Sequence, residues 1–225
     1  RGIVVDGQDN VYVASYNGNK IFKVTPQGAV SEYASGNGLN LPWSMAIDDS
    51  GKIYVANYGG DNVLVIPPGG TPATYATGID GPTGLAFRNG ELWVTGRIDG
   101  NVYRVPAGGG AATLVVGGFS NPTGICFDSA GNAYVTNREK HEIVRLSPQG
   151  HVSKFATFNY YPESIAIRTN GIMTVSGTRQ YMIEYDLNGR TVGYHSASHM
   201  NYGIAMDADR NLYVTSGRGW GAYSR

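Results

Sequence analysis

The chain has 225 residues, and its 17 Lys and Arg residues balance its 17 Asp and Glu residues, so the formal net charge is zero. This balance argues against a protein that coats nucleic acid or an anionic membrane, because both partners need a basic excess. Charged residues make up only 15% of the chain and Gly contributes 33 residues, which excludes a coiled coil or helical bundle. The hydrophobic content of 41% is too high for a disordered chain. No apolar run approaches about 18 residues, so no membrane span is expected.

A segment of the type Gly-Ile-Ala-x-Asp recurs along the whole chain and starts a repeat of 39 to 42 residues. The repeats begin near residues 2, 44, 84, 124, 164 and 203. Short β-branched and aromatic runs, separated by Gly, Asn, Asp and Pro, follow each start, which is the pattern of strands and turns. In chain order the pattern predicts strands at 2–6, 11–14, 20–24, 29–33, 44–48, 53–56, 62–66, 73–75, 84–88, 92–95, 101–105, 112–116, 124–128, 133–136, 142–146, 152–155, 164–168, 173–176, 182–185, 191–194, 203–207 and 212–215.

Four strands in about 40 residues are typical of one blade of a β-propeller. The sequence therefore predicts an all-β, six-bladed propeller of four-stranded antiparallel blades, with residues 1–225 forming a single domain. The sixth blade is expected to be incomplete, because only three strands fit between Gly203 and the last residue. Its fourth strand would have to come from before Arg1, unless the chain is trimmed or this blade has three strands. An uncovered outer edge there would favour aggregation.

The repeat pattern also resembles a known family. The run Pro-x-Gly-Ile-Ala-x-Asp-x-x-Gly-Asn-x-Tyr-Val-x-Asn, followed by Asn-x-Ile-x-x-Val, resembles NHL-type propeller repeats over the whole chain. It is also similar to the repeats of streptogramin (virginiamycin B) lyases and, more distantly, of gluconolactonases. A lyase resemblance implies a His base, a divalent metal and a supporting carboxylate. A gluconolactonase resemblance implies a Glu with several Asn or Asp residues around one divalent ion.

One face of such a propeller, the rim, collects the loops between strands two and three and the loops that join consecutive blades. Rim positions differ most from repeat to repeat, as expected for loops that carry function. Arg97 and Arg138 occupy equivalent places on adjacent blades, so they need either an anionic ligand or a carboxylate partner such as Glu163. The predicted ligand-binding residues are Tyr16, Trp43, Tyr58, Arg97, Arg138, Glu163, Arg179, Tyr202 and Arg218.

Three functions stay open at this point. The main expectation is a non-catalytic, secreted, periplasmic or cell-surface domain that recognises a small molecule, glycan or protein at the rim without a cofactor. The second is a metal-dependent lyase or lactonase, in which Glu163 acts with His141 or His199, or holds Ca²⁺ or Mg²⁺ with Asn57 and Asn137. No His-x-His or His-x-x-x-His spacing supports that metal site. The third is an architectural disc whose channel is filled by Arg–Glu and Tyr contacts.

The single Cys126 excludes an intramolecular disulfide and a cysteine-based zinc site. It is expected to be a small buried residue of a first strand. Some NHL propellers bind RNA, which needs a basic face, and the neutral net charge argues against that use here.

Overall fold

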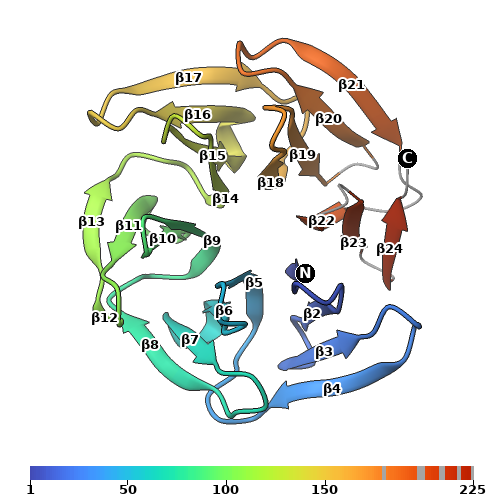
Figure 1. The fold of residues 1–225 in the computed structure, drawn as a ribbon. Coiled ribbons are helices and arrows are strands. Elements are labelled where there is room, and N and C mark those ends of the chain that lie inside the picture. Colours follow the sequence, from blue (N-terminus) through green and yellow to red (C-terminus); the bar gives the residue numbers. More distant parts are fainter. Residues whose placement is uncertain (179–180, 197–200, 208–210, 217–218, 224–225) are drawn as a thin grey trace.

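The computed structural model is a β-propeller and describes residues 1–178, 181–196, 201–207, 211–216 and 219–223. Four-stranded antiparallel sheets are arranged around a central axis (Figure 1). The blades are β1–β4 (Ile3–Val5, Val11–Ser15, Lys20–Val24, Val30–Ser35), β5–β8 (Pro42–Ile47, Ile53–Asn57, Asn62–Ile66, Ala73–Thr77), β9–β11 with β13 (Pro82–Arg88, Glu91–Gly96, Asn101–Val105, Thr113–Val116), β14–β17 (Pro122–Phe127, Ala133–Asn137, Glu142–Leu146, Val152–Thr157) and β18–β21 (Pro162–Ile167, Met173–Gly177, Tyr181–Tyr185, Thr191–Ser196).

The last repeat forms a smaller sheet of three strands, β22 (Asn201–Met206), β23 (Leu212–Ser216) and β24 (Gly219–Tyr223). The structure therefore has five complete four-stranded blades rather than six, while the expectation that the last repeat would hold only three strands is confirmed. The reason is that no described segment pairs with the outer edge of β24, so this repeat lacks a fourth strand in the described part of the chain. β22 nevertheless lies between β18 and β1, and both neighbours contact it.

The first strand of each blade lies nearest the axis, and the fourth lies on the perimeter (Figure 1). Crowding near the axis explains the small residues of the first strands. A Cβ on Gly84 would fall 2.9 Å from the carbonyl oxygen of Thr123 in the next blade. Real Cβ atoms do not approach backbone that closely, so only Gly lets these neighbouring strands meet.

The hydrophobic core lies between adjacent sheets. Ile53, Val55 and Leu64 of the second blade pack with Ile21 and Ala34 of the first in one cluster. Because the central strands are covered by a sheet on each side, their residues are buried on both faces, and all five residues of β6 are buried. Each blade is therefore stabilised mainly by its neighbours, as in other repeat architectures.

A polar latch closes the turn between the first and second strands of four repeats. In each, an Asp carboxylate accepts a hydrogen bond of 3.0 Å from a Tyr hydroxyl six residues later. The latched pairs are Asp6–Tyr12, Asp48–Tyr54, Asp128–Tyr134 and Asp207–Tyr213. The other two blades carry Arg88 and Arg168 where these four have Asp.

Two further features complete the fold. A short strand, β12 (Gly110–Ala111), leaves the third blade and pairs in parallel with β8, so it covers the outer edge of the second blade. Two short 3₁₀ turns, η1 (Tyr58–Gly60) and η2 (Arg138–Lys140), follow the second strands of the second and fourth blades. Among the described residues no helix is long and apolar enough to cross a membrane.

Candidate functional site

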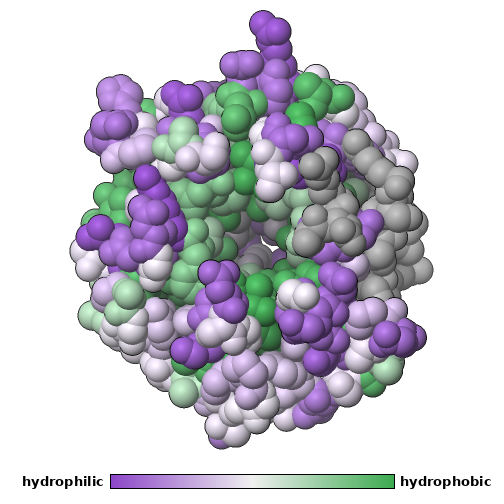
Figure 2. Space-filling model, in the orientation of Figure 1, coloured by the Kyte–Doolittle hydropathy of each residue, from purple (hydrophilic) through white to green (hydrophobic). Residues whose placement is uncertain are grey.

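The rim lies where the second strands end and the first strands begin. Tyr58 and Arg138 open the 3₁₀ turns after β6 and β15, and Arg97 directly follows β10. Trp43 and Glu163 are the second residues of β5 and β18. Inward of these residues is a narrow cavity of about 70 Å³, lined by first-strand residues and by Trp43 and Glu163. A central opening, bordered in part by hydrophobic residues, is visible in the space-filling view (Figure 2).

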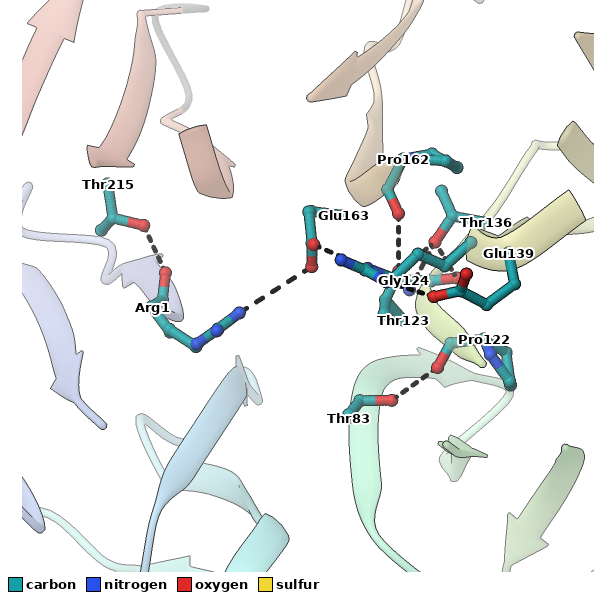
Figure 3. A network of polar contacts seen from close by, with 11 residues as sticks. Arg1, Thr83, Pro122, Thr123, Gly124, Thr136, Glu139, Pro162, Glu163 and Thr215 are labelled. Atoms are coloured by element: carbon teal, nitrogen blue, oxygen red, sulfur yellow. Dashed lines mark hydrogen bonds and ion pairs between the residues drawn. The ribbon is translucent and has the colours of Figure 1, made fainter. Parts of the chain in front are cut away.

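Glu163 is the centre of an ionic cluster at the rim end of this cavity, here called the mouth. Its side chain is only 3% exposed, and Oε1 accepts a hydrogen bond of 2.9 Å from Nε of Arg138. Oε2 lies 3.8 Å from Nη1 of Arg1, so the carboxylate stands between two guanidinium groups (Figure 3). Arg138 also pairs with Glu139. Burial alone would lower the pKa of Arg138, but the hydrogen bond and charge of Glu163 outweigh burial and raise it.

An aromatic cluster lies beside the ionic one. The ring centroids of Tyr16 and Tyr58 are 5.5 and 5.1 Å from that of Trp43. The guanidinium carbons of Arg1 and Arg97 lie 3.9 and 4.7 Å from the centroid of Trp43, which is within range for cation–π attraction. Trp43 therefore contacts two cations and two aromatic rings, and this arrangement fixes its orientation.

Arg97 differs from the other two arginines. In the part of the chain that the structure describes, its guanidinium forms no ion pair or side-chain hydrogen bond, and it lies over the Trp43 ring. Burial lowers the pKa of Arg97, Glu163 opposes that shift, and the positive charges of Arg138 and Arg1 add to it. Arg97 is thus a half-buried cation without a carboxylate in contact, and its guanidinium donors are available to an anionic partner.

These contacts show which of the predicted rim residues lie together and which arginine pairs with Glu163. The structure brings Tyr16, Trp43 and Tyr58 together, and it places Glu163 against Arg138 but not against Arg97. Tyr202 joins the same group, because the Arg1 guanidinium lies 4.3 Å from its ring centroid. The predicted residues Arg179, Arg218 and His199 lie outside the described residues.

The residues suggested for a metal ion are engaged in other contacts. Oδ1 of Asn57 accepts the backbone N–H of Asn40 at 2.6 Å, and Oδ1 of Asn137 accepts that of Ser120 at 2.7 Å. Both side chains are buried and anchor loops, while Glu163 is held by arginines. Across the described ranges no three or more His, Cys, Asp or Glu side chains gather in a way that could hold a metal. In this arrangement the three residues do not fit a divalent cation.

His141, the other suggested catalytic residue, adopts a left-handed backbone conformation at the end of η2. Its ring lies 4.6 Å from the ring of Tyr161, over which the Arg138 guanidinium also lies, at 4.4 Å. Tyr161 and Glu139 were not predicted to belong to the rim. Tyr161 stands directly before Pro162, one of the repeated prolines, so the repeat alignment held the signal that could have identified it.

The sequence also did not reveal how the blades are joined at the mouth. Oγ1 of Thr83 donates to the carbonyl oxygen of Pro122 at 2.9 Å, and Oγ1 of Thr123 donates to that of Pro162 at 3.0 Å (Figure 3). The hydroxyl of Thr215, on the second strand β23, bonds to the Arg1 carbonyl oxygen. The Thr83 and Thr123 hydroxyls thus tie one first strand to the next, and the Thr215 hydroxyl ties the last repeat to the first.

Comparison with known proteins supports the fold. Residues 119–146 match the NHL repeat. No curated protein matches the chain in sequence. The structure resembles a gluconolactonase from Xanthomonas campestris with a TM-score of 0.88 at 16% identity, covering 99% of this chain and 84% of that one.

It also resembles a streptogramin B lyase, with a TM-score of 0.78 at 13% identity over 98% of this chain and 91% of that one. A chain of a nidogen/laminin complex gives a TM-score of 0.82 at 18% identity, over 91% and 83% of the two chains. At such low identities these likenesses show a shared β-propeller fold. They include enzymes and a protein complex, so the fold alone does not choose a function.

Proposed function

We propose that this chain is a non-catalytic recognition propeller whose rim binds a ligand that carries an anionic group beside a planar or apolar surface. The observation that carries the proposal is Arg97, a half-buried guanidinium against Trp43 with no carboxylate contact in the described part of the chain. A ligand carboxylate or phosphate would supply the missing partner, and a guanidinium can bind either group with two parallel hydrogen bonds.

The charge balance of the rim supports an anionic ligand. Three guanidinium groups, those of Arg1, Arg97 and Arg138, face two carboxylates, those of Glu163 and Glu139. The cluster therefore keeps one positive charge although the whole chain is neutral. The aromatic cluster beside it offers stacking area for the body of the ligand. A small molecule, an acidic sugar or an acidic side chain of a protein would each fit this description.

Phenyl phosphate, which has one aromatic ring and one anionic group, is a suitable probe. It should bind saturably and quench Trp43 fluorescence, and Arg97→Gln should weaken binding at least tenfold because a charge-assisted contact is lost. Arg190→Gln, which removes an exposed arginine from a turn of the fifth blade, is the matched control and should leave binding unchanged. Equal affinity for the wild type and Arg97→Gln would refute the proposal. Complete absence of binding would favour an architectural disc, for which the Arg1–Glu163–Arg138 contacts serve as a plug.

The enzyme alternative draws its support from the similarity to a gluconolactonase and a streptogramin B lyase. It requires a divalent cation near Glu163, so metal content measured on protein purified without chelator tests it directly. Stoichiometric Ca²⁺ or Mg²⁺ that is lost in Glu163→Gln would support a metal-dependent lyase or lactonase. We further propose that β22–β24 acts as the sixth blade of the ring, and that the domain works outside the cytoplasm.

A further inference from the structure

A second hollow lies on the face opposite the rim, between the third and fourth blades. We call it the β13 groove, and its volume is about 390 Å³. The turn between β9 and β10 and the turn between β16 and β17 form its ends, and both turns are at the opposite strand ends from Arg97 and Arg138. Its wall includes Arg88, Glu91, Trp93, Arg104, Leu114 and Val115.

The groove lies where the third blade lacks the Asp–Tyr latch that four repeats share. Four repeats close this turn with an Asp–Tyr latch, whereas the third blade has Arg88 and Trp93 in those places. The indole Nε1 of Trp93 is buried and has no hydrogen-bond partner among the described residues. A buried donor without a partner costs stability, so this exchange brings the fold no hydrogen bond in place of the latch. The fifth blade lacks the latch as well, but its Arg168 pairs with Glu184 at 2.7 Å, whereas Arg88 has no carboxylate partner among the described residues.

The charges in the groove leave an excess of one positive charge. Arg88 forms no ion pair within the described ranges, and its guanidinium carbon lies 5.4 Å from the ring centroid of Phe127 in the next blade. The Arg88 guanidinium lies over Gly131, whose positive φ of 84° is set by the turn between β14 and β15. Arg104 lies 3.6 Å from Glu91, longer than a hydrogen bond, and both side chains are partly exposed. Such a pair is weak and leaves Arg104 able to take another partner.

Apolar surface lies directly beside these cations. Leu114 and Val115 of β13 are 57% and 38% exposed, although both are large and hydrophobic. They line the groove together with the Trp93 side chain. A ligand that covered Leu114 and Val115 would remove apolar surface from water, which is favourable in proportion to the area covered.

We propose that the β13 groove binds a small organic carboxylate with a short apolar body. The carboxylate is held by the guanidinium groups of Arg88 and Arg104, and the body lies along Leu114, Val115 and the Trp93 ring. The groove volume falls in the range of about 300 to 1,000 Å³ that is common for small-molecule sites. This site is independent of the rim, so either proposal can fail without the other.

Hexanoate is the probe, and the indole N–H signals in a ¹H–¹⁵N NMR spectrum are the readout. The Trp93 signal is identified as the one that disappears in Trp93→Phe. Hexanoate should shift it saturably, while the neutral hexanamide should not. Arg88→Gln and Arg104→Gln should each weaken hexanoate binding at least tenfold, because a charge-assisted hydrogen bond is lost. Arg97→Gln on the rim should leave hexanoate binding unchanged.

Leu114→Glu provides a second variant that does not disturb the interior, because Leu114 is exposed. It places a negative charge where the apolar body would lie, and it should abolish the hexanoate shift. Equal shifts by hexanoate and hexanamide, or unchanged hexanoate affinity in folded Arg88→Gln and Arg104→Gln proteins, would overturn the proposal. A saturable shift lost in Arg97→Gln would assign the binding to the rim and also overturn it.

Discussion

Replacing Glu163 by Gln tests whether this carboxylate neutralises the rim. Gln keeps the shape and one oxygen acceptor for Arg138, so the change removes mainly the negative charge. Removing one partner of a fully buried ion pair costs roughly 3–5 kcal/mol. The Glu163 side chain is 3% exposed, but those of Arg138 and Arg1 are 18% and 24% exposed. Arg138 also keeps Glu139. We therefore expect Glu163→Gln to lower the free energy of unfolding by about 2 kcal/mol.

For a domain of this size, about 2 kcal/mol corresponds to a melting temperature lower by roughly 4–8 °C. Differential scanning calorimetry at pH 7 measures it. Glu32→Gln is the matched control, because Glu32 forms an ion pair of similar length with Lys20 on the surface, and its loss should leave the midpoint nearly unchanged. The double variant Glu163→Gln/Arg138→Gln should lose less than the sum of the single losses. A Glu163→Gln protein as stable as the wild type would show that the carboxylate does not neutralise these arginines.

Three more outcomes are expected. Thr123→Val removes the hydrogen bond to the Pro162 carbonyl oxygen between two blades, and urea unfolding should show a loss of about 1–3 kcal/mol. Burial alone would raise the pKa of Asp128, but hydrogen bonds from Asn132 and Tyr134 outweigh burial and lower it. This carboxylate therefore stabilises the fold above its unfolded pKa of about 4. The stability difference between the wild type and Tyr134→Phe should accordingly shrink as pH falls through the lower, folded pKa of Asp128; a constant difference would contradict the latch. Burial raises the pKa of the Cys126 thiol, so an aromatic disulfide reagent should react with it only after unfolding, and fast reaction in the native protein would contradict its burial.

Most of the fold could be predicted from the sequence because its signals are local. Alternating apolar residues and Gly or Asn turns recur with the repeat, so the predicted strand at 53–56 and the observed Ile53–Asn57 nearly coincide. The incomplete last repeat could be predicted as well, because only three strands fit after Gly203. Whether a segment far away in the sequence pairs with the outer edge of its third strand could not be predicted, because such pairing leaves no local signal.

The site could be predicted only in part. The repeat alignment placed Arg97 and Arg138 on one rim, but it could not say which of them Glu163 would meet. In the structure Glu163 of the fifth blade meets Arg138 of the adjacent fourth blade, and Arg97 lies one blade further away. The segments before the two arginines also differ, because Oδ1 of Asn137 accepts the backbone N–H of Ser120, whereas Gly96 stands at the corresponding place and has no side chain to form such a bond.

Equivalent positions in different repeats can be compared, and the comparison separates residues that serve folding from residues that serve function. At the mouth, Thr83 and Thr123 bind the next blade through their hydroxyls, and each also contacts the hydroxyl of a buried Thr on its own second strand. The fifth blade has Glu163 at this place, and the hydroxyl of Ser176 on its second strand is buried with no partner among the described residues. A Thr would satisfy the fold, so the carboxylate is better explained by the arginines it orients than by the packing of its blade.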